Sequence, residues 1–477
     1  MTGKRENISK IKKKTGIALF WIVIWQVVAV IVNNPVYFAG PIETIMELTG
    51  QWKTISYWQA IGGSTVRILF GFLLASITGY MAAYFAGQRK WLSEILVGPV
   101  NFFQSVPVAA VVVILLIWFG SKKLSLYITF MVVFPNIYRS ALEGFTSADR
   151  KLSEVAEVFS IDKKDRFRYI YKEAAGSNLR GSIPFCIGMS FKSGIAAEII
   201  GVSAHSIGER LYVDKITLNT AGVFAWMISI LLLSALVEKG LLFVLAQAEK
   251  NGLRLEGQRE RTFIEDSRTK DDRKEEEDDE DTYPGIRIEI EKLSASYEEK
   301  PVWKDLTHTF EEGKIHCIYG ESGIGKTTLL RILAGLEQAD EGKVIWKAGT
   351  SDCDRPSIGM CFQENRLFER HTALKNLEIS GSSGCARTIL KETFAVDTFG
   401  KPVRTYSGGM KRRLALIRTL LSKQTLLLLD EPFTGLDEET KKQTIGWIGR
   451  YRKGRTVLLV THDPQDARDL GAETFSL

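Results

Sequence analysis

Six predominantly apolar stretches in the first half of the chain constrain its fold more than any other feature. Their approximate bounds are Ile17–Val32, Ser64–Ala86, Ile95–Phe119, Leu124–Leu142, Gly181–Ile200 and Gly222–Ala248. Each is near the roughly 20 residues that a helix needs to cross a bilayer. Backbone polar groups find no water in lipid, so a spanning segment of this length must be helical. The sequence therefore predicts an all-α membrane domain with six transmembrane helices.

The first of these stretches could be mistaken for a signal peptide, because it follows the basic segment Lys4–Lys14. No small-x-small cleavage site comes after it, since VIVNNP is a poor candidate. We therefore expect it to remain as the first span. With the N-terminus inside, the predicted inside segments carry 16 lysines and arginines and the outside loops carry five. This bias predicts a multi-pass protein of the cell membrane with both termini in the cytosol.

Two charged residues lie inside the fifth apolar stretch, where charge is costly and usually faces a cavity or a partner. Lys192 is in mid-span, and Glu198 is toward the outer end. A lysine that faces a cavity predicts an anionic or polar solute. The alternative is that Lys192 pairs with a carboxylate or extends its ammonium to the membrane interface. The sequence leaves both interpretations open.

After about residue 250 the chain has the mixed, charged composition of a globular protein. A total of 477 residues predicts two or three domains. The five cysteines form no C-x-x-C pair, and most fall in this second half. Because we place this half in the reducing cytosol, we expect free buried thiols rather than disulfides or a zinc site.

The second half contains a phosphate-binding loop. The sequence GESGIGKTT (Gly320–Thr328) follows the apolar run Ile315–Tyr319 and leads into LLRILAGL, which predicts a strand, a loop and a helix. Glycines let backbone N–H groups turn toward a phosphate, and the helix adds its positive end. Lys326 can reach the β- and γ-phosphates, and Thr327 can bind Mg²⁺. The predicted nucleotide contacts are Gly320, Ser322, Gly323, Gly325, Lys326, Thr327 and Thr328.

Two further apolar runs predict fully buried parallel strands. In TLLLLDEP (Thr425–Pro432) the apolar run leads to Asp430 and Glu431. In TVLLVTHD the predicted strand ends at His462. Asp430 can hold Mg²⁺ through water, and Glu431 can orient and deprotonate the attacking water. A strand-terminal Asp-Glu pair is ambiguous by itself, so the prediction of an ATP hydrolase rests on the further motifs that accompany it.

From about Gly285 these motifs, in their order, resemble an ATP-binding-cassette ATPase. YSGGMKRRLALIRTLL (Tyr406–Leu421) resembles the family signature L-S-G-G-Q, with Tyr406 and Met410 in place of the commonest residues. The resemblance implies an α/β P-loop NTPase cassette with a small helical subdomain. It also implies that Ser407, Gly408 and Gly409 contact the γ-phosphate bound to the other cassette of a dimer.

The same resemblance implies roles for four more residues. Tyr297 stacks on adenine, Gln363 reaches Mg²⁺ and the attacking water, Asp437 belongs to the D-loop, and His462 contacts the γ-phosphate. The predicted catalytic residues are thus Glu431, His462 and Gln363, and the predicted Mg²⁺ ligands are Thr327, Gln363 and Asp430. The other four histidines match no motif, and we expect them to be structural or exposed.

The membrane half resembles the permeases of ATP-binding-cassette importers of the nitrate/sulfonate/taurine type, over about Tyr37 to Glu249. In the longest inside loop, Glu154-Val155-Ala156 and Ser160 resemble the E-A-A-x-x-x-G loop, with Ser160 in place of the usual glycine. In that family the loop forms a short helix that docks on the cassette. Without the resemblance, the loop could be a solvated amphipathic helix at the membrane surface.

The predicted domains are a permease over residues 1–254 with a coupling loop near 150–180, a charged linker over 255–283 and the cassette over 284–477. The linker ends in EEEDDED (Glu275–Asp281), whose like charges repel and extend the chain. Ser407 comes only 44 positions after Gln363, and 15 residues follow His462. We therefore expect a trimmed helical subdomain and no C-terminal regulatory domain.

Together these features predict an ATP-driven importer in which one chain supplies a permease and a cassette and two copies form a homodimer. The expected partners are a separate extracytoplasmic solute-binding protein, membrane lipid and a small polar or anionic solute. The resemblance suggests nitrate, a sulfonate such as taurine, or a vitamin precursor. No nucleic-acid partner is expected, and the cofactors are ATP and Mg²⁺. The alternatives are a nucleotide-gated regulatory membrane protein and an exporter.

Overall fold

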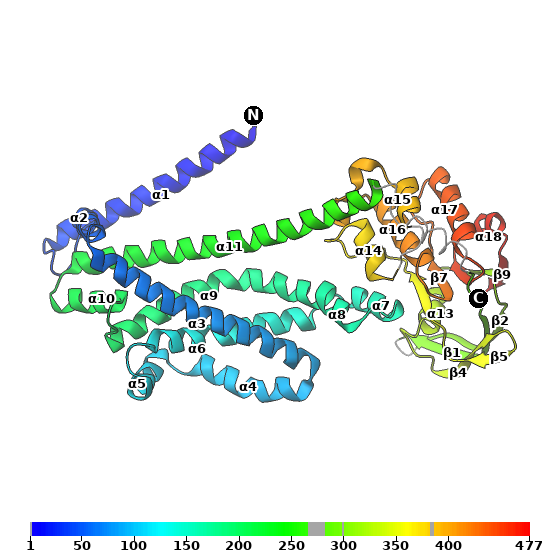
Figure 1. The fold of residues 1–477 in the computed structure, drawn as a ribbon, viewed down its shortest axis with the longest axis horizontal. Coiled ribbons are helices and arrows are strands. Elements are labelled where there is room, and N and C mark those ends of the chain that lie inside the picture. The colour runs from blue at the N-terminus through cyan, green and yellow to red at the C-terminus, as the bar shows by residue number, and fades with distance from the viewer. Residues whose placement is uncertain (1, 266–281, 298–299, 382–385) are drawn as a thin grey trace. The chain divides into compact units, whose positions relative to one another are not determined.

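The computed structural model describes residues 2–265, 282–297, 300–381 and 386–477. By its internal contacts the chain divides into two compact units (Figure 1). The helical unit consists of Met1–Ser147 and Ala174–Ala246, and the α/β unit consists of Ala148–Glu173 and Gln247–Leu477.

The helical unit is built from long helices joined by short loops. They are α1 (Thr2–Val32), α2 (Pro41–Trp52), α3 (Ile55–Gln88), α4 (Lys90–Ser105), α5 (Val108–Phe119), α6 (Leu124–Thr146), α9 (Lys172–Gly201), α10 (Ile207–Ile216) and the first part of α11 (Thr220–Glu265). Glycines let neighbouring helices approach closely. A Cβ on Gly71 of α3 would lie 2.6 Å from the carbonyl oxygen of Leu126, and one on Gly194 of α9 would lie 2.7 Å from Ile68. Small residues of this kind favour helix packing inside membranes.

The two charged residues of the fifth predicted span have different surroundings. Glu198 is fully buried and forms an ion pair with Arg67 of α3 at 3.1 Å, and its carboxylate also accepts a hydrogen bond from Ser64 at 2.5 Å. It therefore joins α9 to α3. Lys192 is exposed on α9, and no carboxylate of the described residues forms an ion pair with it.

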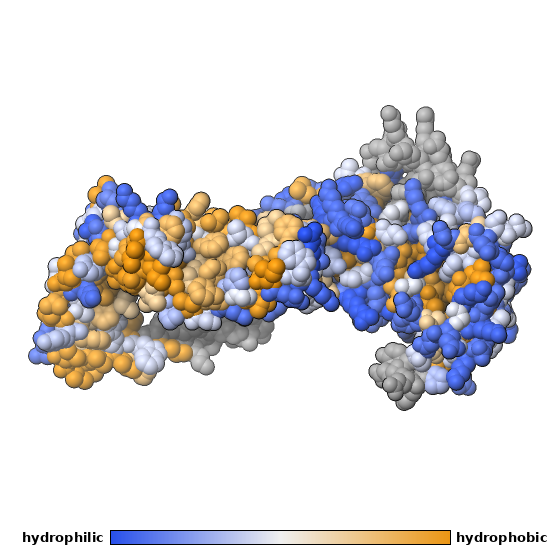
Figure 2. Space-filling model, turned by 90° about the horizontal axis from the view of Figure 1, so that it is seen from below, coloured by the Kyte–Doolittle hydropathy of each residue, from blue (hydrophilic) through white to orange (hydrophobic). Residues whose placement is uncertain are grey.

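Exposed apolar side chains mark the helical unit as a membrane domain (Figure 2). Among the described residues, the large hydrophobic side chains that are exposed lie between Ile17 and Leu255, with Val396 as the one exception. Apolar surface of this extent is rare on soluble monomers and indicates contact with lipid or with other helices.

By length and hydropathy, four helical stretches of the described chain are suited to cross a membrane, or five if the bent pair of α4 and α5 is one span. The single stretches are Thr15–Val32, Ile55–Gln88, Lys163–Gly201 and Thr220–Ile264. Six spans were predicted, and the one that this measure omits is Leu124–Leu142, which forms most of α6. This helix carries Asn136 and Arg139, which lower its mean hydropathy, although 14 of its 23 residues are buried.

The α/β unit contains two sheets. The parallel sheet has the strand order β6-β7-β8-β3-β9, and the antiparallel sheet has the order β2-β1-β4-β5. The strands are β1 (Arg287–Tyr297), β2 (Lys300–Phe310), β3 (Ile315–Tyr319), β4 (Glu341–Ala348), β5 (Ser351–Cys353), β6 (Ile358–Cys361), β7 (Leu426–Asp430), β8 (Thr456–Val460) and β9 (Glu473–Ser476). Strands β7 and β8 are buried throughout, as their apolar runs predict, although β8 ends at Val460, before His462.

Helices surround the parallel sheet and form a smaller helical part beside it. They are α7 (Arg150–Val158), α8 (Lys163–Arg166), a π-helical turn (Phe167–Tyr171), α13 (Lys326–Leu333), α14 (Ala373–Ile379), α15 (Ala386–Thr393), α16 (Gly408–Leu420), α17 (Glu438–Tyr451) and α18 (Pro464–Leu470). We call the part that contains α14, α15 and the start of α16 the helical subdomain.

The predicted linker over residues 255–283 is only partly described. Helix α11 continues to Glu265, so residues 255–265 are helical rather than an extended tether, and Glu260 and Ile264 are buried. Apolar Phe263 and Ile264 explain the difference, because they give this end of the helix a face that packs against the helical subdomain. The acidic run Glu275–Asp281 lies outside the described residues.

Candidate active site

The phosphate-binding loop has the predicted strand–loop–helix setting between β3 and α13. Gly320, Gly323 and Gly325 have φ values of 154°, 86° and 102°, which residues with a Cβ rarely adopt. A Cβ on Gly325 would lie 2.2 Å from Val302 Cγ1, so the packing also requires glycine there. Lys326 Nζ donates to the carbonyl oxygens of Gly320 and Glu321 at 2.8 Å each, which folds the lysine back over the loop.

A pair of oxygen ligands lies next to this loop. Thr327 Oγ1, in the first turn of α13, is 3.0 and 3.2 Å from the two carboxylate oxygens of Asp430 at the end of β7. Asp430 is 1% exposed, and burial raises the pKa of its carboxyl, against the hydrogen bond from Thr327. A hydroxyl and a carboxylate held together are oxygen donors of the kind that Mg²⁺ prefers. The donor set therefore fits the predicted Mg²⁺ site.

Glu431 and His462 are neighbours, although they follow different strands. His462 Nδ1 is 3.9 Å from Glu431 Oε1, and the other carboxylate oxygen of Glu431 accepts a hydrogen bond from Thr434 at 3.2 Å. Glu431 has a φ of 46°, a left-handed conformation that is uncommon outside glycine and that clusters at functional sites. The His462 side chain is 73% exposed, so it is accessible to a ligand.

Gln363 follows β6, the strand beside β7, and its side chain is exposed. Tyr297 ends β1, where its backbone is paired with Lys300, and its side chain lies outside the described part of the structure. Ser322 and Thr328 lie in the loop and in the first turn of α13, respectively. The structure therefore brings Lys326, Thr327, Asp430, Glu431 and His462 to the ends of adjacent strands of one sheet.

The signature residues form the start of a helix. Ser407 is the N-cap of α16, and its hydroxyl accepts a hydrogen bond from the backbone N–H of Met410 at 3.3 Å. A Cβ on Gly408 would meet nothing within 4 Å, so this end of the helix is open. Asp437 caps α17 and accepts from the backbone N–H of Thr440 at 2.9 Å. Within the described chain, no hydrogen bond or ion pair joins Ser407, Gly408 or Gly409 to the phosphate-binding loop.

Sequence reasoning missed Arg412, which fixes the backbone of the site. This side chain is 3% exposed and comes from α16. It donates to the carbonyl oxygens of Phe362, Gln363, Asp430, Glu431 and Pro432 at 2.5 to 3.1 Å. One guanidinium therefore holds the ends of β6 and β7 in register. The sequence does contain one indication of this role. Arg412 precedes Ala415 by three residues and Leu416 by four, and this helical spacing places it on the buried face of α16.

The loop that resembles E-A-A packs within the α/β unit. Glu154 of α7 receives hydrogen bonds from Arg331 of α13 at 3.0 and 3.1 Å and from Arg366, which follows Gln363 closely in sequence, at 2.5 Å. Burial favours the neutral acid, but the two arginines outweigh it and lower the pKa of Glu154 to about 2. Val155 and Ala156 are fully buried in the same contact. The alternative of a solvated surface helix is therefore wrong.

The departure of this loop from the family pattern at Ser160 has a structural explanation, and Glu173 at the end of the loop joins two distant segments. Ser160 has a φ of 52°, so it adopts the left-handed conformation that glycine provides most readily. Glu173, at the second position of the pair Lys172-Glu173, accepts a hydrogen bond from His371 Nε2 at 2.9 Å, and Glu256 contacts Nδ1 of the same ring at 2.9 Å. The sequence assigned no role to His371, because both partners come from distant segments.

A helical unit with an apolar surface, followed by a P-loop ATPase whose carboxylates end a buried parallel strand, defines a membrane transport ATPase. Residues 71–246 match the inner membrane component of binding-protein-dependent transport systems, and residues 303–434 match the ABC transporter family. The chain belongs to the ABC transporter family, as an importer-type permease fused to its ATPase, and it couples ATP hydrolysis to transport.

Three relatives match the ATPase part of the chain. The thiamine import ATP-binding protein ThiQ of Mesorhizobium japonicum is 35% identical and covers 40% of this chain and 81% of its own length. The aliphatic sulfonates import ATP-binding protein SsuB 3 of Pseudomonas savastanoi pv. phaseolicola is 37% identical over 38% of this chain and 70% of its own length. The sulfate/thiosulfate import ATP-binding protein CysA of Neisseria meningitidis is 32% identical over 39% and 58%.

Proposed function

We propose that two copies of this chain form an importer for a small polar or anionic solute that a separate extracytoplasmic binding protein delivers. The ion-pair cluster of Glu154 carries the proposal. This carboxylate lies on the loop between α6 and α9, and its partners Arg331 and Arg366 lie on the helix that begins at Lys326 and on the segment after Gln363. A change at the nucleotide is thus passed to a permease loop through two ion pairs.

The proposed residue roles follow the geometry of the site. Lys326 and the backbone N–H groups of the glycine loop bind the phosphates of ATP. Glu431 accepts a proton from water while the water oxygen attacks the γ-phosphorus and the bond to the β,γ-bridging oxygen breaks, which yields ADP and phosphate. His462 orients the γ-phosphate, and the exposed side chain of Gln363 senses it.

Thr327, Asp430 and Gln363 are the proposed ligands for Mg²⁺, which neutralises phosphate charge when it is bound. Tyr297 stacks on adenine, and Ser407, Gly408, Gly409 and Asp437 complete the site of a second copy. The open face of Gly408 supports this arrangement, because a phosphate must approach the backbone there. Two copies in a closed dimer then hold two composite sites.

The proposed transport cycle is alternating access. ATP closes the two cassettes and opens the membrane halves outward, and hydrolysis with product release returns the cavity inward. Both termini and the ATPase are cytosolic in this proposal, in agreement with the positive charge of the inside segments. We divide the chain at Ala246, because residues 247–265 pack with the ATPase.

The proposed solutes are sulfonates such as taurine, nitrate, and vitamin precursors. The names of the relatives, which import thiamine, aliphatic sulfonates or sulfate, support this range. Lys192 supports the anionic members, because it is an exposed charge in mid-span with no carboxylate partner in the described chain.

The first experiment measures ATP turnover by the purified chain in nanodiscs, with Glu431→Gln as the control. We expect turnover that Glu431→Gln abolishes, and stimulation by the matching solute-binding protein. Absence of turnover from a folded dimer, with and without the binding protein, would refute the proposal that two copies of this chain supply both working ATPase sites. Stimulated turnover without solute uptake into proteoliposomes would instead identify a nucleotide-gated regulatory protein, and ATP-driven efflux would identify an exporter.

A further inference from the structure

The last turns of α11 pack against the ATPase as one of its own helices. Helix α11 is continuous from Thr220 to Glu265, and its residues from Gln247 onward belong to the α/β unit. We propose that residues 247–265 are an integral helix of the ATPase's helical subdomain, in which Glu256 and Glu260 position the segment that leads from Gln363 to the signature. The alternative is that these residues are a passive tether between the permease and the ATPase.

Two carboxylates on α11 complete the N-terminal end of α14. The first N–H groups of any helix have no partner within it. Glu256 accepts from the backbone N–H of Thr372 at 2.7 Å, and Glu260 accepts from that of Leu374 at 2.8 Å. The other oxygen of Glu260 accepts from the backbone N–H of Gly400 at 2.5 Å. Glu260 is fully buried, so it ties two turns of the subdomain together.

The backbones of α11 and the subdomain touch at two glycines. A Cβ on Gly257 would lie 2.5 Å from the carbonyl oxygen of Gly400, and a Cβ on Gly400 would lie 2.8 Å from the carbonyl oxygen of Gly257. Contact this close leaves no space for a side chain on either side. Gly252, on the same helix, has no atom within 4 Å of the position of its Cβ.

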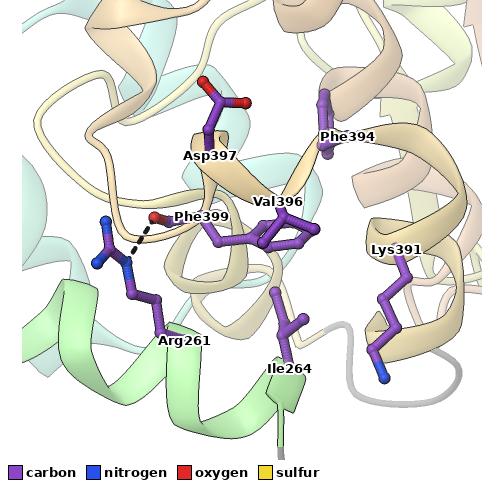
Figure 3. A pocket seen from close by; sticks show the side chains of 7 residues that line it. All are labelled: Arg261, Ile264, Lys391, Phe394, Val396, Asp397 and Phe399. Carbon is purple, nitrogen blue, oxygen red and sulfur yellow. Dashed lines mark hydrogen bonds between the residues drawn. The ribbon is translucent and has the colours of Figure 1, made fainter.

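The end of α11 also contributes to the hydrophobic core of the subdomain. Ile264 is 3% exposed and lies in one cluster with Phe394 and Phe399, and Arg261 Nε donates to the carbonyl oxygen of Phe399 at 3.0 Å (Figure 3). The ring of Phe394 is 5.5 Å from the ring of Tyr406, which directly precedes the signature. A contact chain therefore runs from α11 to Ser407.

The subdomain needs this support because its own helices are short. Helices α14 and α15 have 7 and 8 residues, and helices of that length are marginal without tertiary packing. Glu256 and Glu260 cap the N-terminal end of α14, and Ile264 adds an apolar side chain to the core of the subdomain. Gly257 lets α11 approach the subdomain closely. The proposal rests on the proposed function only where it predicts the effect on ATP turnover, because the signature acts on the nucleotide of a second copy.

The test compares the same substitution at two sites of α11 in the full chain. Alanine favours a helix over glycine, so a passive tether predicts that Gly257→Ala and Gly252→Ala both raise or preserve the melting temperature. The proposal predicts that Gly257→Ala lowers the melting temperature of the ATPase by at least about 3 °C, or prevents folding, while Gly252→Ala does not. Equal melting temperatures in the two variants would overturn the proposal.

A second pair tests the positioning role. We expect Glu260→Gln to lower kcat for ATP at least tenfold while the affinity for a fluorescent ATP analogue stays within twofold, because the phosphate-binding loop is intact. Lys250→Gln, which also removes one charge but from an exposed position of α11, should leave both values within twofold. Unchanged kcat in Glu260→Gln, or an equal loss in Lys250→Gln, would refute the positioning role. If the wild-type chain itself lacks turnover, the proposed function fails, and the melting comparison at Gly257 and Gly252 still decides this inference.

Discussion

At the scale of single residues, Arg412 is the side chain on which the geometry of the catalytic strand ends depends most. Arg412→Ala removes the guanidinium hydrogen bonds to five carbonyl oxygens, of which that of Glu431 still accepts from the backbone N–H of Thr434. We expect the substitution to lower the free energy of unfolding of the ATPase by about 4 kcal/mol. Arg412→Lys keeps the charge but lacks the planar fork, so its loss should be intermediate. Thermal unfolding of the full chain measures both.

The control for this prediction is Lys442→Ala, which removes a positive charge from an exposed position on α17. It should change stability by less than about 0.5 kcal/mol. If Arg412→Ala is no worse than this control, the five hydrogen bonds do not hold the strand ends together.

His371 makes stability depend on pH. Burial favours the neutral ring, but hydrogen bonds with Glu173 and Glu256 outweigh it and raise its pKa to about 9. The unfolded chain has a histidine pKa of about 6.5. A raised pKa contributes stability that is fully present below pH ~6.5 and is lost as the pH rises through ~9. The stability difference between wild type and His371→Gln should therefore shrink between these values.

The check is the melting temperature of both proteins at pH 6, 7.5 and 9. His308→Gln is the control, because burial lowers the pKa of His308, so its effect on stability varies below pH ~6.5 and stays constant between pH 7.5 and pH 9. A constant difference between wild type and His371→Gln from pH 6 to pH 9 would contradict the prediction.

The sequence predicted the residues that follow strands better than those that act through packing. Thr327 with Asp430 and Glu431 with His462 lie together because parallel strands end at one edge of a sheet, and their motifs are local. Arg412 lies in α16 among other lysines and arginines, and only its position in the apolar period of the helix distinguishes it from them. The partners of His371 come from segments distant in sequence, so no local pattern could identify them.

At the scale of elements, the turn after α7 carries strain that glycine would relieve. Ser160 has a φ of 52°, and a left-handed residue with a Cβ costs about 1 kcal/mol. Ser160→Gly should therefore stabilise the docked loop by about 0.5–1 kcal/mol, less the extra entropy of glycine in the unfolded chain. Ser153→Gly, inside α7, should destabilise by a similar amount. Hydrogen exchange of residues 150–161 measures the opening of this element. Faster exchange in Ser160→Gly than in wild type would contradict the prediction that the backbone at Ser160 is strained.

The long helices and the buried strands could be predicted because each carries a regular apolar period or run. The end of α11 could not, because residues 255–265 are mostly polar by composition and become helical through contacts with the ATPase. From the sequence alone, Glu256 and Glu260 are two more charges of the predicted linker. In the structure they accept hydrogen bonds from backbone N–H groups at the start of α14. Tertiary partners of this kind override a local composition.

At the scale of the whole molecule, the arrangement of the composite sites is the property that most needs a test. Each chain has one phosphate-binding loop and one signature, and the structure joins them by no hydrogen bond or ion pair among its described residues. If each site takes its loop from one copy and its signature from the other, Lys326→Ala and Ser407→Arg inactivate a homodimer separately. In a mixed dimer of these two variants, one site carries both changes and the other carries neither.

Co-expression of the two variants with different affinity tags, followed by tandem purification, isolates the mixed dimer. We expect each variant alone to have no ATP turnover, and the mixed dimer to recover up to about half of the wild-type rate, because one of two sites is intact. A chain that carries both substitutions, paired with wild type, has no intact site and should remain inactive. If loop and signature instead acted within one chain, the outcomes would be reversed: the mixed dimer of single variants would be inactive, and the doubly substituted chain with wild type would keep one site. The two pairs therefore distinguish a shared site from a self-contained one even where absolute rates are low.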